Sequence, residues 1–433
     1  MCSNRRFHGN GLVVSLGIDF GTSGARAIAL SSTGQILAQT QQAFDSKSAA
    51  DPQGWQQVLW QLLADLPQDV RQQLQGIAIN GTSATVLLCD RAGNPLTAPL
   101  LYNDARGGVG LDELENIAPE GSPALSATSS LAKALWWQRH LPAEPLSQAR
   151  YLLHQADWLS AQLHSQWGIS DYHNALKLGY DVAERRYPDW LLALPIANWL
   201  PTVKVPGSKI APILPEISRR LDLPATCQVY AGTTDSIAAF LASGAQRPGE
   251  AVTSLGSTLV LKLLSPCPVN DSATGVYSHR LGDLWLAGGA SNSGGAVLKQ
   301  FFPDSQLSHL SQQIDLSQPC PYDYYPLPQP GERFPVNDPA YAPRLTPRPD
   351  SDVAFLYGLL DGIARIEATG YRLLQRLGAP AVQRVYTAGG GAQNWVWQEL
   401  RSRHLRVPVC PAGATEAAYG TARLAQSGDS LYL

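Results

Sequence analysis

Hydrophobic and polar residues alternate along the first segments of the chain. The alternation over Val13–Leu30 predicts a β-hairpin, and Ile36–Thr40 continues it as a meander. Asp51 and Pro52 predict the start of a helix, because aspartate caps helix amino ends and proline suits the first turn. Apolar residues then recur at helical spacing, which predicts a helix packed on a sheet face: Trp55, Val58, Leu59, Leu62, Leu63 and Leu66.

A second hairpin of the same design lies in the other half of the chain. Between 76 and 89 come a buried strand (76–79), a turn (80–83) and a further strand (85–89), typical of an α/β layer pattern. The apolar segments Glu250–Leu255 and Leu259–Leu264 then flank a turn of Gly, Ser and Thr. The chain therefore looks built twice, with one such hairpin opening each half.

The middle and end of the chain alternate helical segments with irregular ones. Helical spacing predicts helices over 131–140, 155–163, 353–376 and 415–426. Ten prolines fall between 319 and 349, which exclude a long helix or a central strand there. We expect a boundary near Leu223-Pro224-Ala225-Thr226, giving domains over 11–225 and 226–433, with 1–10 as a frayed leader.

Composition excludes several classes of protein. The 433 residues are too many for one core. Charged residues make up 15% and the net charge is −3, so no excess of positive charge is present to bind nucleic acid. The six cysteines lack any Cys-x-x-Cys spacing, and no apolar run is long enough to span a bilayer. We expect a cytoplasmic protein with reduced, mostly buried thiols and no membrane partner.

The turn of the first hairpin has the parts needed to hold a nucleotide phosphate. Gly21 and Gly24 allow positive φ and close backbone approach, so that consecutive N–H groups can point at an anion. Asp19, at the end of the first strand, can bind Mg²⁺ directly or through its water shell. One such turn is weak support for function, but several in a fixed order are far more specific.

An ordered set of motifs resembles the FGGY carbohydrate kinases from about Leu12 to Ala425. The set reads Asp19-Phe20-Gly21-Thr22-Ser23, Gly81-Thr82-Ser83, Asn103-Asp104-Ala105-Arg106, Gly232-Thr233-Thr234-Asp235, Leu255-Gly256-Ser257-Thr258 and Gly389-Gly390-Gly391-Ala392, with Gly331-Glu332-Arg333-Phe334-Pro335 in the proline-rich segment. The resemblance implies an α/β fold of two actin-like (ribonuclease H-like) domains with a nucleotide and sugar cleft between them. Within the family it is similar to the short xylulose-kinase-like branch, some of whose members act on D-ribulose.

By that resemblance, the two hairpins are phosphate loops and ATP is the co-substrate, with Mg²⁺. Gly390, Gly391 and Asn394 would lie against the adenosine, where a side chain on either glycine would clash with the nucleotide. The nucleotide-binding residues so implied are Thr22, Gly232, Thr233, Gly256, Ser257, Thr258, Gly389, Gly390, Gly391, Ala392 and Asn394.

The resemblance also implies the reacting groups. Asp235 is similar in position to the family's catalytic base, with Asp19 and Thr22 acting on the phosphates. The alternative for Asp235 is a helix N-cap, and Arg106 could equally be a surface ion pair. The sugar-binding residues implied are Asp19, Ser23, Gly24, Ala25, Arg26, Ser83, Asp104 and Asp235. His154 and His173 are expected to be hydrogen-bonded rather than ligands.

The leading hypothesis is an ATP-dependent kinase that converts D-ribulose to D-ribulose 5-phosphate. Alternatives within the class are a kinase of D-xylulose or another polyol. Two other classes stay open: an actin-fold ATPase that works as a conformational module, and a sugar sensor with little kinase activity. The expected partners are a small-molecule sugar and ATP, and the chain is expected to be a monomer or a homodimer.

Overall fold

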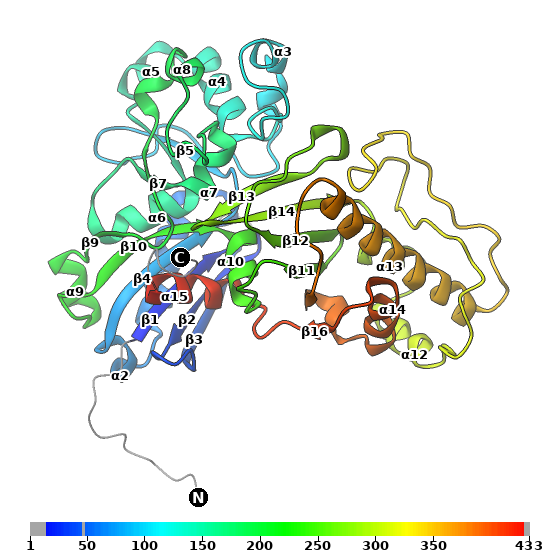
Figure 1. Ribbon diagram of the computed structural model, residues 1–433. Helices are drawn as coiled ribbons and strands as arrows, with labels where there is room; N and C mark the ends of the chain where they lie inside the picture. Colours follow the sequence, from blue (N-terminus) through cyan, green and yellow to red (C-terminus); the bar gives the residue numbers. More distant parts are fainter. Residues whose placement is uncertain (1–13, 46–47, 428–433) are drawn as a thin grey trace, which may run out of the picture. The chain divides into compact units, whose positions relative to one another are not determined.

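The computed structural model describes residues 14–45 and 48–427, so the expected leader over 1–10 lies outside the described residues. Within the described part, the chain divides into two compact units. The first comprises 14–118, 124–241 and 416–427, and the second comprises 119–123 and 242–415. Figure 1 shows both, with each sheet covered by helices.

A six-stranded mixed sheet forms the centre of the first unit, in the order β3-β2-β1-β4-β10-β9. The first three strands form the predicted antiparallel meander, and β4 and β10 add to β1 in parallel. The strands are β1 (Val14–Phe20), β2 (Gly24–Leu30), β3 (Ile36–Ala43), β4 (Leu74–Gly81), β10 (Gln228–Thr234) and β9 (Lys209–Pro212).

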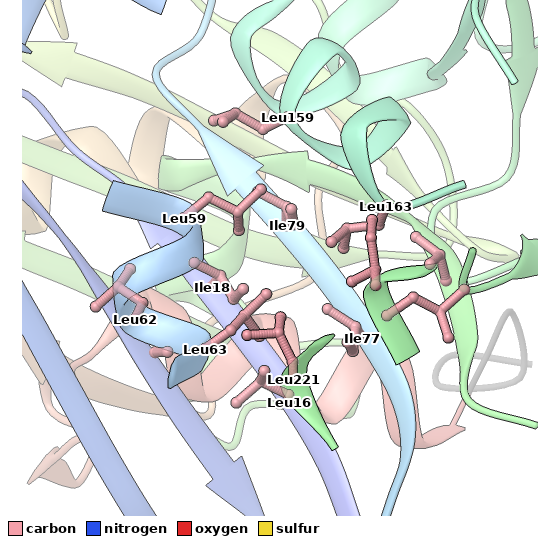
Figure 2. Close-up of a cluster of buried hydrophobic side chains, with 14 of the residues drawn as sticks. Leu16, Ile18, Leu59, Leu62, Leu63, Ile77, Ile79, Leu159, Leu163 and Leu221 are labelled. Atoms are coloured by element: carbon pink, nitrogen blue, oxygen red, sulfur yellow. The ribbon is translucent and has the colours of Figure 1, made fainter. Parts of the chain in front are cut away.

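Apolar side chains pack into a core on one face of this sheet. They come from alternate strand residues and from helix residues spaced three or four apart, as the sequence pattern predicts. Every second residue of β1 and β4 meets residues three or four positions apart on α1 (Pro52–Ala64) and α6 (Gln155–His164), as Figure 2 shows. These side chains are fully buried: Leu16, Ile18, Ile77, Ile79, Leu59, Leu62, Leu63, Leu159 and Leu163. Each stabilises the fold by about 1.5–3 kcal/mol. Asp51 caps α1 as predicted, since its side chain accepts from two backbone amides.

The remaining elements of the first unit form a second cluster and two small sheets. A helical cluster centred on α4 (Ser130–His140) packs against the pair β5 (Val86–Cys89) and β6 (Tyr151–His154). The other elements are β7 (Ile169–Asp171), β8 (Thr202–Lys204), α2 (Gln68–Arg71), α3 (Leu111–Glu115), α5 (Ala143–Gln148), α7 (Tyr172–Ala175), α8 (Asp189–Leu192), α9 (Pro215–Leu221), α10 (Asp235–Ala242), α15 (Ala417–Ser427) and four short 3-10 helices, η1 (Ser48–Ala50), η2 (Arg106–Gly108), η3 (Leu176–Leu178) and η4 (Ala197–Trp199).

Five strands in the sheet of the second unit repeat the order β3-β2-β1-β4-β10 of the first. The order in the second sheet is β13-β14-β12-β11-β15-β16, in which the antiparallel strands β14, β12 and β11 are followed by the parallel strands β15 and β16. The prediction of a chain built twice is therefore confirmed. The strands are β11 (Glu250–Leu255), β12 (Leu259–Ser265), β13 (Tyr277–Leu281), β14 (Leu284–Ser291), β15 (Arg384–Ala388) and β16 (Val409–Pro411).

Helices of 7 to 25 residues flank this second sheet. The helices are α11 (Gly295–Phe301), α12 (Asp304–Gln312), α13 (Asp352–Arg376) and α14 (Trp395–Leu405), with the 3-10 helices η5 (Ser272–Thr274) and η6 (Gly390–Gln393). Residues 319–349, all within the described part, hold no helix or strand, as their prolines predicted. No helix among the described residues is both long and apolar enough to cross a bilayer.

The structure differs from the predicted organisation at two places. The strand β10, expected to open the second half, pairs with β4 in the first sheet. The last helix, α15, packs on the first sheet as well, where Ala418 and Ala422 meet Ile28 and Leu30 (Figure 1, red helix beside the blue strands). Both segments join the first unit because their apolar faces complete its sheet and its core.

The cysteines also differ from expectation. Of the five within the described residues, only Cys89 and Cys227 are buried. Cys267 is exposed, and Cys320 and Cys410 are partly exposed. The expectation of mostly buried thiols is therefore wrong, since a scattered cysteine pattern carries no information about which strand face each residue occupies.

Candidate functional site

The carboxyl ends of three parallel strands bring the predicted catalytic residues to one edge of the first sheet. In the register of β1 and β4, Asp19 lies opposite Asn80. In the register of β4 and β10, Thr234 lies opposite Gly81, so Asp235 follows directly beyond the edge. Ligands bind at such edges in α/β folds, because the strand ends and helix starts meet there. Residues far apart in the sequence thus form one polar site.

Asp19 is the most strongly perturbed group at this edge. Burial and then the negative charge of Asp235 raise the pKa of Asp19 from 3.8 to about 7, while Arg26 and Asn80 oppose the shift. Its Oδ1 atom is shielded from solvent and has no hydrogen-bond partner among the described residues. An unpartnered buried carboxylate oxygen suits a cation or its water shell.

Magnesium fits this site only with the help of a phosphate. The described residues contain no group of three or more His, Cys, Asp and Glu side chains that could hold a metal ion. Mg²⁺ is commonly bound through one or two carboxylates together with waters and substrate phosphates. Asp19 is thus compatible with a nucleotide-borne Mg²⁺ but not with a dedicated metal cage.

Asp235 begins α10, and its Oδ1 accepts a hydrogen bond of 2.6 Å from the backbone amide of Ser236. The carboxylate is only partly exposed. Burial lowers the pKa of Lys177, and the charge of Asp235 opposes that shift, which shows that the two groups interact. Asp235 thus interacts with both Lys177 and Asp19, and such interacting charged groups are typical of functional sites.

The tip of the first hairpin is placed as predicted, but its glycines act differently. Thr22 and Ser23 are exposed at the turn. Neither Gly21 nor Gly24 has a positive φ, and the Gly21 amide donates to the Gly24 carbonyl at 3.0 Å. A Cβ on Gly24 would lie 2.5 Å from the Gln42 carbonyl oxygen. The expectation of positive φ is therefore wrong, and Gly24 is needed for close packing on β3.

Two other predicted sugar-binding residues of β2 are engaged within the protein. Ala25 is buried in the core, where its methyl group cannot reach a ligand. Arg26 forms an ion pair with Glu416, and its Nη2 donates to Gln41 at 3.1 Å. Arg26 acts on the site through its charge, because it lowers the pKa of Asp19.

Two loops of the first unit carry the polar groups expected to face the sugar. Ser83 is partly exposed in the loop after β4. Asp104, in the next loop, binds the guanidinium of Arg106 at 2.6 Å, and this hydrogen bond is the main reason that the pKa of Asp104 lies below its ordinary value. Arg106 therefore forms the ion pair that the sequence left open, while Asp104 keeps its negative charge.

The segment before Asp235 is built into the first unit. A Cβ on Gly232 would lie 1.8 Å from the carbonyl oxygen of Ile79 on β4. Thr233 is fully buried, and its hydroxyl is hydrogen-bonded to Nδ1 of His173 at 2.8 Å. Gly232, Thr233 and Thr22 thus lie in the first unit, whereas the remaining predicted nucleotide-binding residues lie in the second.

The second unit contains a cavity of about 470 Å³ lined by five of the residues predicted to bind the nucleotide. These are Gly256, Ser257, Gly390, Gly391 and Asn394. Leu255, Leu298, Leu307 and Trp397 supply apolar wall, and Ser308, Ser311, Gln312 and Gln393 supply polar groups. A few polar groups on an apolar wall, in a volume of this size, suit a small planar ligand with hydrogen-bonding edges.

The two central glycines of this cavity, Gly390 and Gly391, are required for different reasons. A Cβ on Gly390 would meet no protein atom within 4 Å, so only a ligand would exclude a side chain there. A Cβ on Gly391 would lie 2.7 Å from the ring of Trp397, so packing alone requires glycine. Asn394 caps α14 through Trp397 N and donates to Ser311 Oγ. Thr258, Gly389 and Ala392 lie beside the cavity but do not line it.

Comparison with known families assigns one family domain to each unit. The model for the N-terminal domain of the FGGY family of carbohydrate kinases matches residues 14–242, and the model for its C-terminal domain matches residues 251–427. The chain belongs to the FGGY family of carbohydrate kinases. The predicted fold class, α/β with two actin-like domains, is confirmed by solved structures of FGGY kinases that share this fold.

Several FGGY relatives match over nearly the whole chain. A xylulose kinase from Escherichia coli (strain K12) is 26% identical over 436 residues, covering 95% of this chain and 89% of the relative. An L-fuculokinase from Salmonella typhi is 24% identical over 426 residues, covering 92% and 88%. The crystal structure of xylulose kinase from Rhodospirillum rubrum gives a TM-score of 0.82 at 22% identity, covering 97% of this chain and 92% of that chain.

A buried ion pair supports the two strands of this FGGY kinase that precede the Gly256 and Gly390 turns. Arg401 on α14 donates to both carboxylate oxygens of Glu367 at 2.6 and 2.7 Å and to the Thr387 hydroxyl at 2.7 Å. The Thr253 hydroxyl donates to the same carboxylate. Thr253 lies on β11 and Thr387 on β15, so one network joins both strands.

We expect Arg401→Met to lower the free energy of unfolding by about 3–5 kcal/mol, because Glu367 would be left as an uncompensated buried charge. Denaturant unfolding followed by tryptophan fluorescence measures the loss. The double variant Arg401→Met with Glu367→Met is the control and should recover most of it. Equal losses in the single and double variants would contradict this explanation.

Sequence reasoning missed several residues that lie near the polar edge of the first sheet or line the cavity of the second unit. Lys133 is fully buried on α4, and burial lowers its pKa to about 8 despite the opposing charge of Asp104. A lysine within the apolar run 131–137 was the available signal. Sequence reasoning missed Lys177 as well. Leu298 and Ser311 gave no signal, because helical spacing does not tell which helix will border a ligand cavity.

Proposed function

We propose that this FGGY kinase transfers the γ-phosphoryl group of ATP to the terminal hydroxyl of a ketopentose. The hydroxyl oxygen forms a bond to the γ-phosphorus, and the bond from that phosphorus to the β–γ bridging oxygen breaks. The hydroxyl proton passes to Asp235, and ADP leaves. Phosphoryl transfer needs chiefly an acceptor held in line and stabilisation of the developing charge. A cytoplasmic protein acting on a small sugar and ATP is the proposed setting.

One observation carries this proposal. In the strand registers, Asp19, the Gly81–Ser83 turn and Asp235 lie at one edge of the first sheet, where burial and then the charge of Asp235 raise the pKa of Asp19. Asp235 offers the base, and Ser83 and Asp104 offer polar groups to a polyol. The arrangement suits a hydroxyl acceptor.

The second unit supplies the proposed nucleotide site. The apolar walls of its cavity suit an adenine ring, and the exposed turn at Gly256 and Ser257 lies at the same cavity, where phosphates can meet backbone amides. Mg²⁺ that the nucleotide carries would have Asp19 as its protein ligand and would neutralise charge that develops on the phosphates.

We expect Gly390→Leu to raise KM for ATP by at least about tenfold, equivalent to ~1.4 kcal/mol of binding. The added Cβ would meet no protein atom within 4 Å and the side chain would extend into the cavity, so thermal stability should stay close to that of the wild type. Steady-state kinetics with varied ATP, together with Tm, measures both effects. Gly391→Ala is the contrasting variant and should lower Tm, because its methyl group would collide with Trp397. An unchanged KM for ATP in Gly390→Leu would remove the cavity as the adenosine site.

The sugar is proposed at the level of a ketopentose, with D-ribulose first and D-xylulose second. D-Ribulose follows from the sequence resemblance to the short branch of the family. D-Xylulose is supported by relatives named xylulose kinase. The test is ADP release measured with and without a panel of pentuloses, hexuloses, glycerol and other polyols, with ³¹P NMR to identify the phosphorylated carbon.

Each outcome of this panel separates the competing functions. ADP release that requires a pentulose supports the kinase, and the sugar with the highest kcat/KM names the substrate. ADP release that no sugar changes would point to an ATPase module. Sugar binding without ADP release would point to a sensor. Either of the last two results overturns the proposal.

A further inference from the structure

A single buried cation joins the two loops that carry the proposed sugar contacts. Lys133 lies on α4 with none of its surface exposed. Its Nζ donates to the carbonyl oxygen of Ala84 and to that of Leu101, each at 2.7 Å. Ala84 follows Ser83 directly, and Leu101 lies three positions before Asp104. The ammonium group thus fixes the backbone of both loops next to their polar groups.

The first of these loops needs such support. Ala84 is buried and has a φ of 63°, in the left-handed region. This conformation costs a non-glycine residue roughly 1–2 kcal/mol. A surrounding structure must therefore hold the residue there, and the hydrogen bond from Lys133 to its carbonyl does so. Without Lys133, the buried Ala84 carbonyl would lose this donor, and the part-buried Leu101 carbonyl would keep only the Asp104 amide at 2.9 Å.

The same helix also holds the second loop through its side chains. The guanidinium of Arg106 lies 4.9 Å from the ring centre of Trp136, one turn after Lys133 on α4. Arg106 in turn binds the carboxylate of Asp104. A Cβ on Gly107 would lie only 2.6 Å from the Cβ of Ala132, so η2 packs directly on α4. One helix therefore sets the position of both Ser83 and Asp104.

A buried hydrogen-bond chain anchors the start of this helix. The Ser130 hydroxyl is hydrogen-bonded to Nε2 of His154 at 2.9 Å, and Nδ1 of His154 meets Asp157 at 3.0 Å. The order Ser, His, Asp is that of a hydrolase triad, but Ser130 and His154 have no exposed surface. No substrate can reach them, so the chain serves to fix α4.

We propose that Lys133 is a positioning residue for the sugar site, which sets the spacing of the Ser83 and Asp104 loops through two backbone carbonyls. This inference rests on the proposed kinase function. A charged ammonium can satisfy two carbonyls at once, whereas an apolar side chain of the same length can satisfy neither. Lys133 itself does not touch the sugar or the phosphates.

The test compares Lys133→Met with Leu135→Ala. Leu135 is a buried residue of the same helix that makes none of these hydrogen bonds, so its variant controls for lost core packing. With D-ribulose and D-xylulose, we expect Lys133→Met to raise the sugar KM by about tenfold or more and to leave the ATP KM unchanged. Leu135→Ala should lower Tm without changing either KM.

Hydrogen exchange makes the test independent of activity. Amides in 82–85 and 101–104 should exchange faster in Lys133→Met than in Leu135→Ala at equal Tm loss. Equal exchange in both variants overturns the inference, even where no sugar is turned over. In another outcome, the wild type shows no sugar-dependent ADP release while the two variants show the expected difference in exchange. That result would overturn the proposed function but not the role of Lys133 in holding the two loops.

A second variant covers the case in which Lys133→Met does not fold. Trp136→Leu removes the contact with Arg106 but leaves no buried charge or carbonyl without its partner. We expect faster exchange confined to 101–106 and a sugar KM raised several-fold. Unchanged exchange and an unchanged sugar KM in Trp136→Leu would show that α4 does not position the second loop.

Discussion

Replacing Asp235 with asparagine is expected to lower kcat for sugar phosphorylation by about 10²–10⁴-fold, the usual contribution of a general base. Asparagine keeps the Oδ1 acceptor that binds the Ser236 amide at 2.6 Å, so this hydrogen bond at the start of α10 is retained. The substitution therefore removes only the ability to take a proton. ADP release with the preferred pentulose, measured beside Tm, gives the result.

Asp69→Asn is the matched control for this experiment. Asp69 is exposed on α2, which precedes β4 and so lies at the edge of the sheet opposite to Asp235. Its kinetics should equal those of the wild type. Near-normal turnover in Asp235→Asn would assign Asp235 to helix capping and leave the reaction without its proposed base.

Replacing Asp19 with asparagine is expected to lower activity by roughly 10²-fold, because the carboxylate that we propose as the Mg²⁺ ligand would be lost. The same substitution should make the protein more stable. The pKa of Asp19 is about 7 in the folded chain and near 3.8 in the unfolded chain. Between these values the folded state holds a proton that the unfolded state has released, so stability falls as pH rises through this interval.

The stabilisation by Asp19→Asn should therefore depend on pH. Without magnesium, we expect Tm to rise by a few degrees at pH 8, by less at pH 5, and to be unchanged near pH 4. Thermal unfolding at the three pH values measures this trend. A rise in Tm that does not change with pH, or a fall in Tm at pH 8, would show that the charged form of Asp19 does not destabilise the folded state.

Local sequence patterns predicted most of the elements but not their neighbours. The meander, the capped helix α1 and the second hairpin follow from alternation, spacing and capping residues, which are local properties. The placement of β10 and α15 in the first unit depends on contacts between segments that lie far apart in the chain. Ala418 and Ala422 carry no mark that they will pack on Ile28 and Leu30.

The same division applies to the candidate site. Motif order led to Asp19 and Asp235, and the strand registers place both at one edge. The roles of the glycines were less predictable. The sequence does not show whether a glycine is needed for a turn, for close packing or to leave space for a ligand. Gly390 and Gly391 are adjacent, yet only the first faces open space. Lys133 was missed because burial of a charge cannot be read from helical spacing.

The position of α15 has a consequence for synthesis of the chain. The face of the first sheet that carries Ile28 and Leu30 is covered by a helix made almost 390 residues later. While the ribosome is still translating, that apolar face has no cover from its own chain. The amino-terminal half must therefore wait, or be shielded by a chaperone, until α15 has been translated.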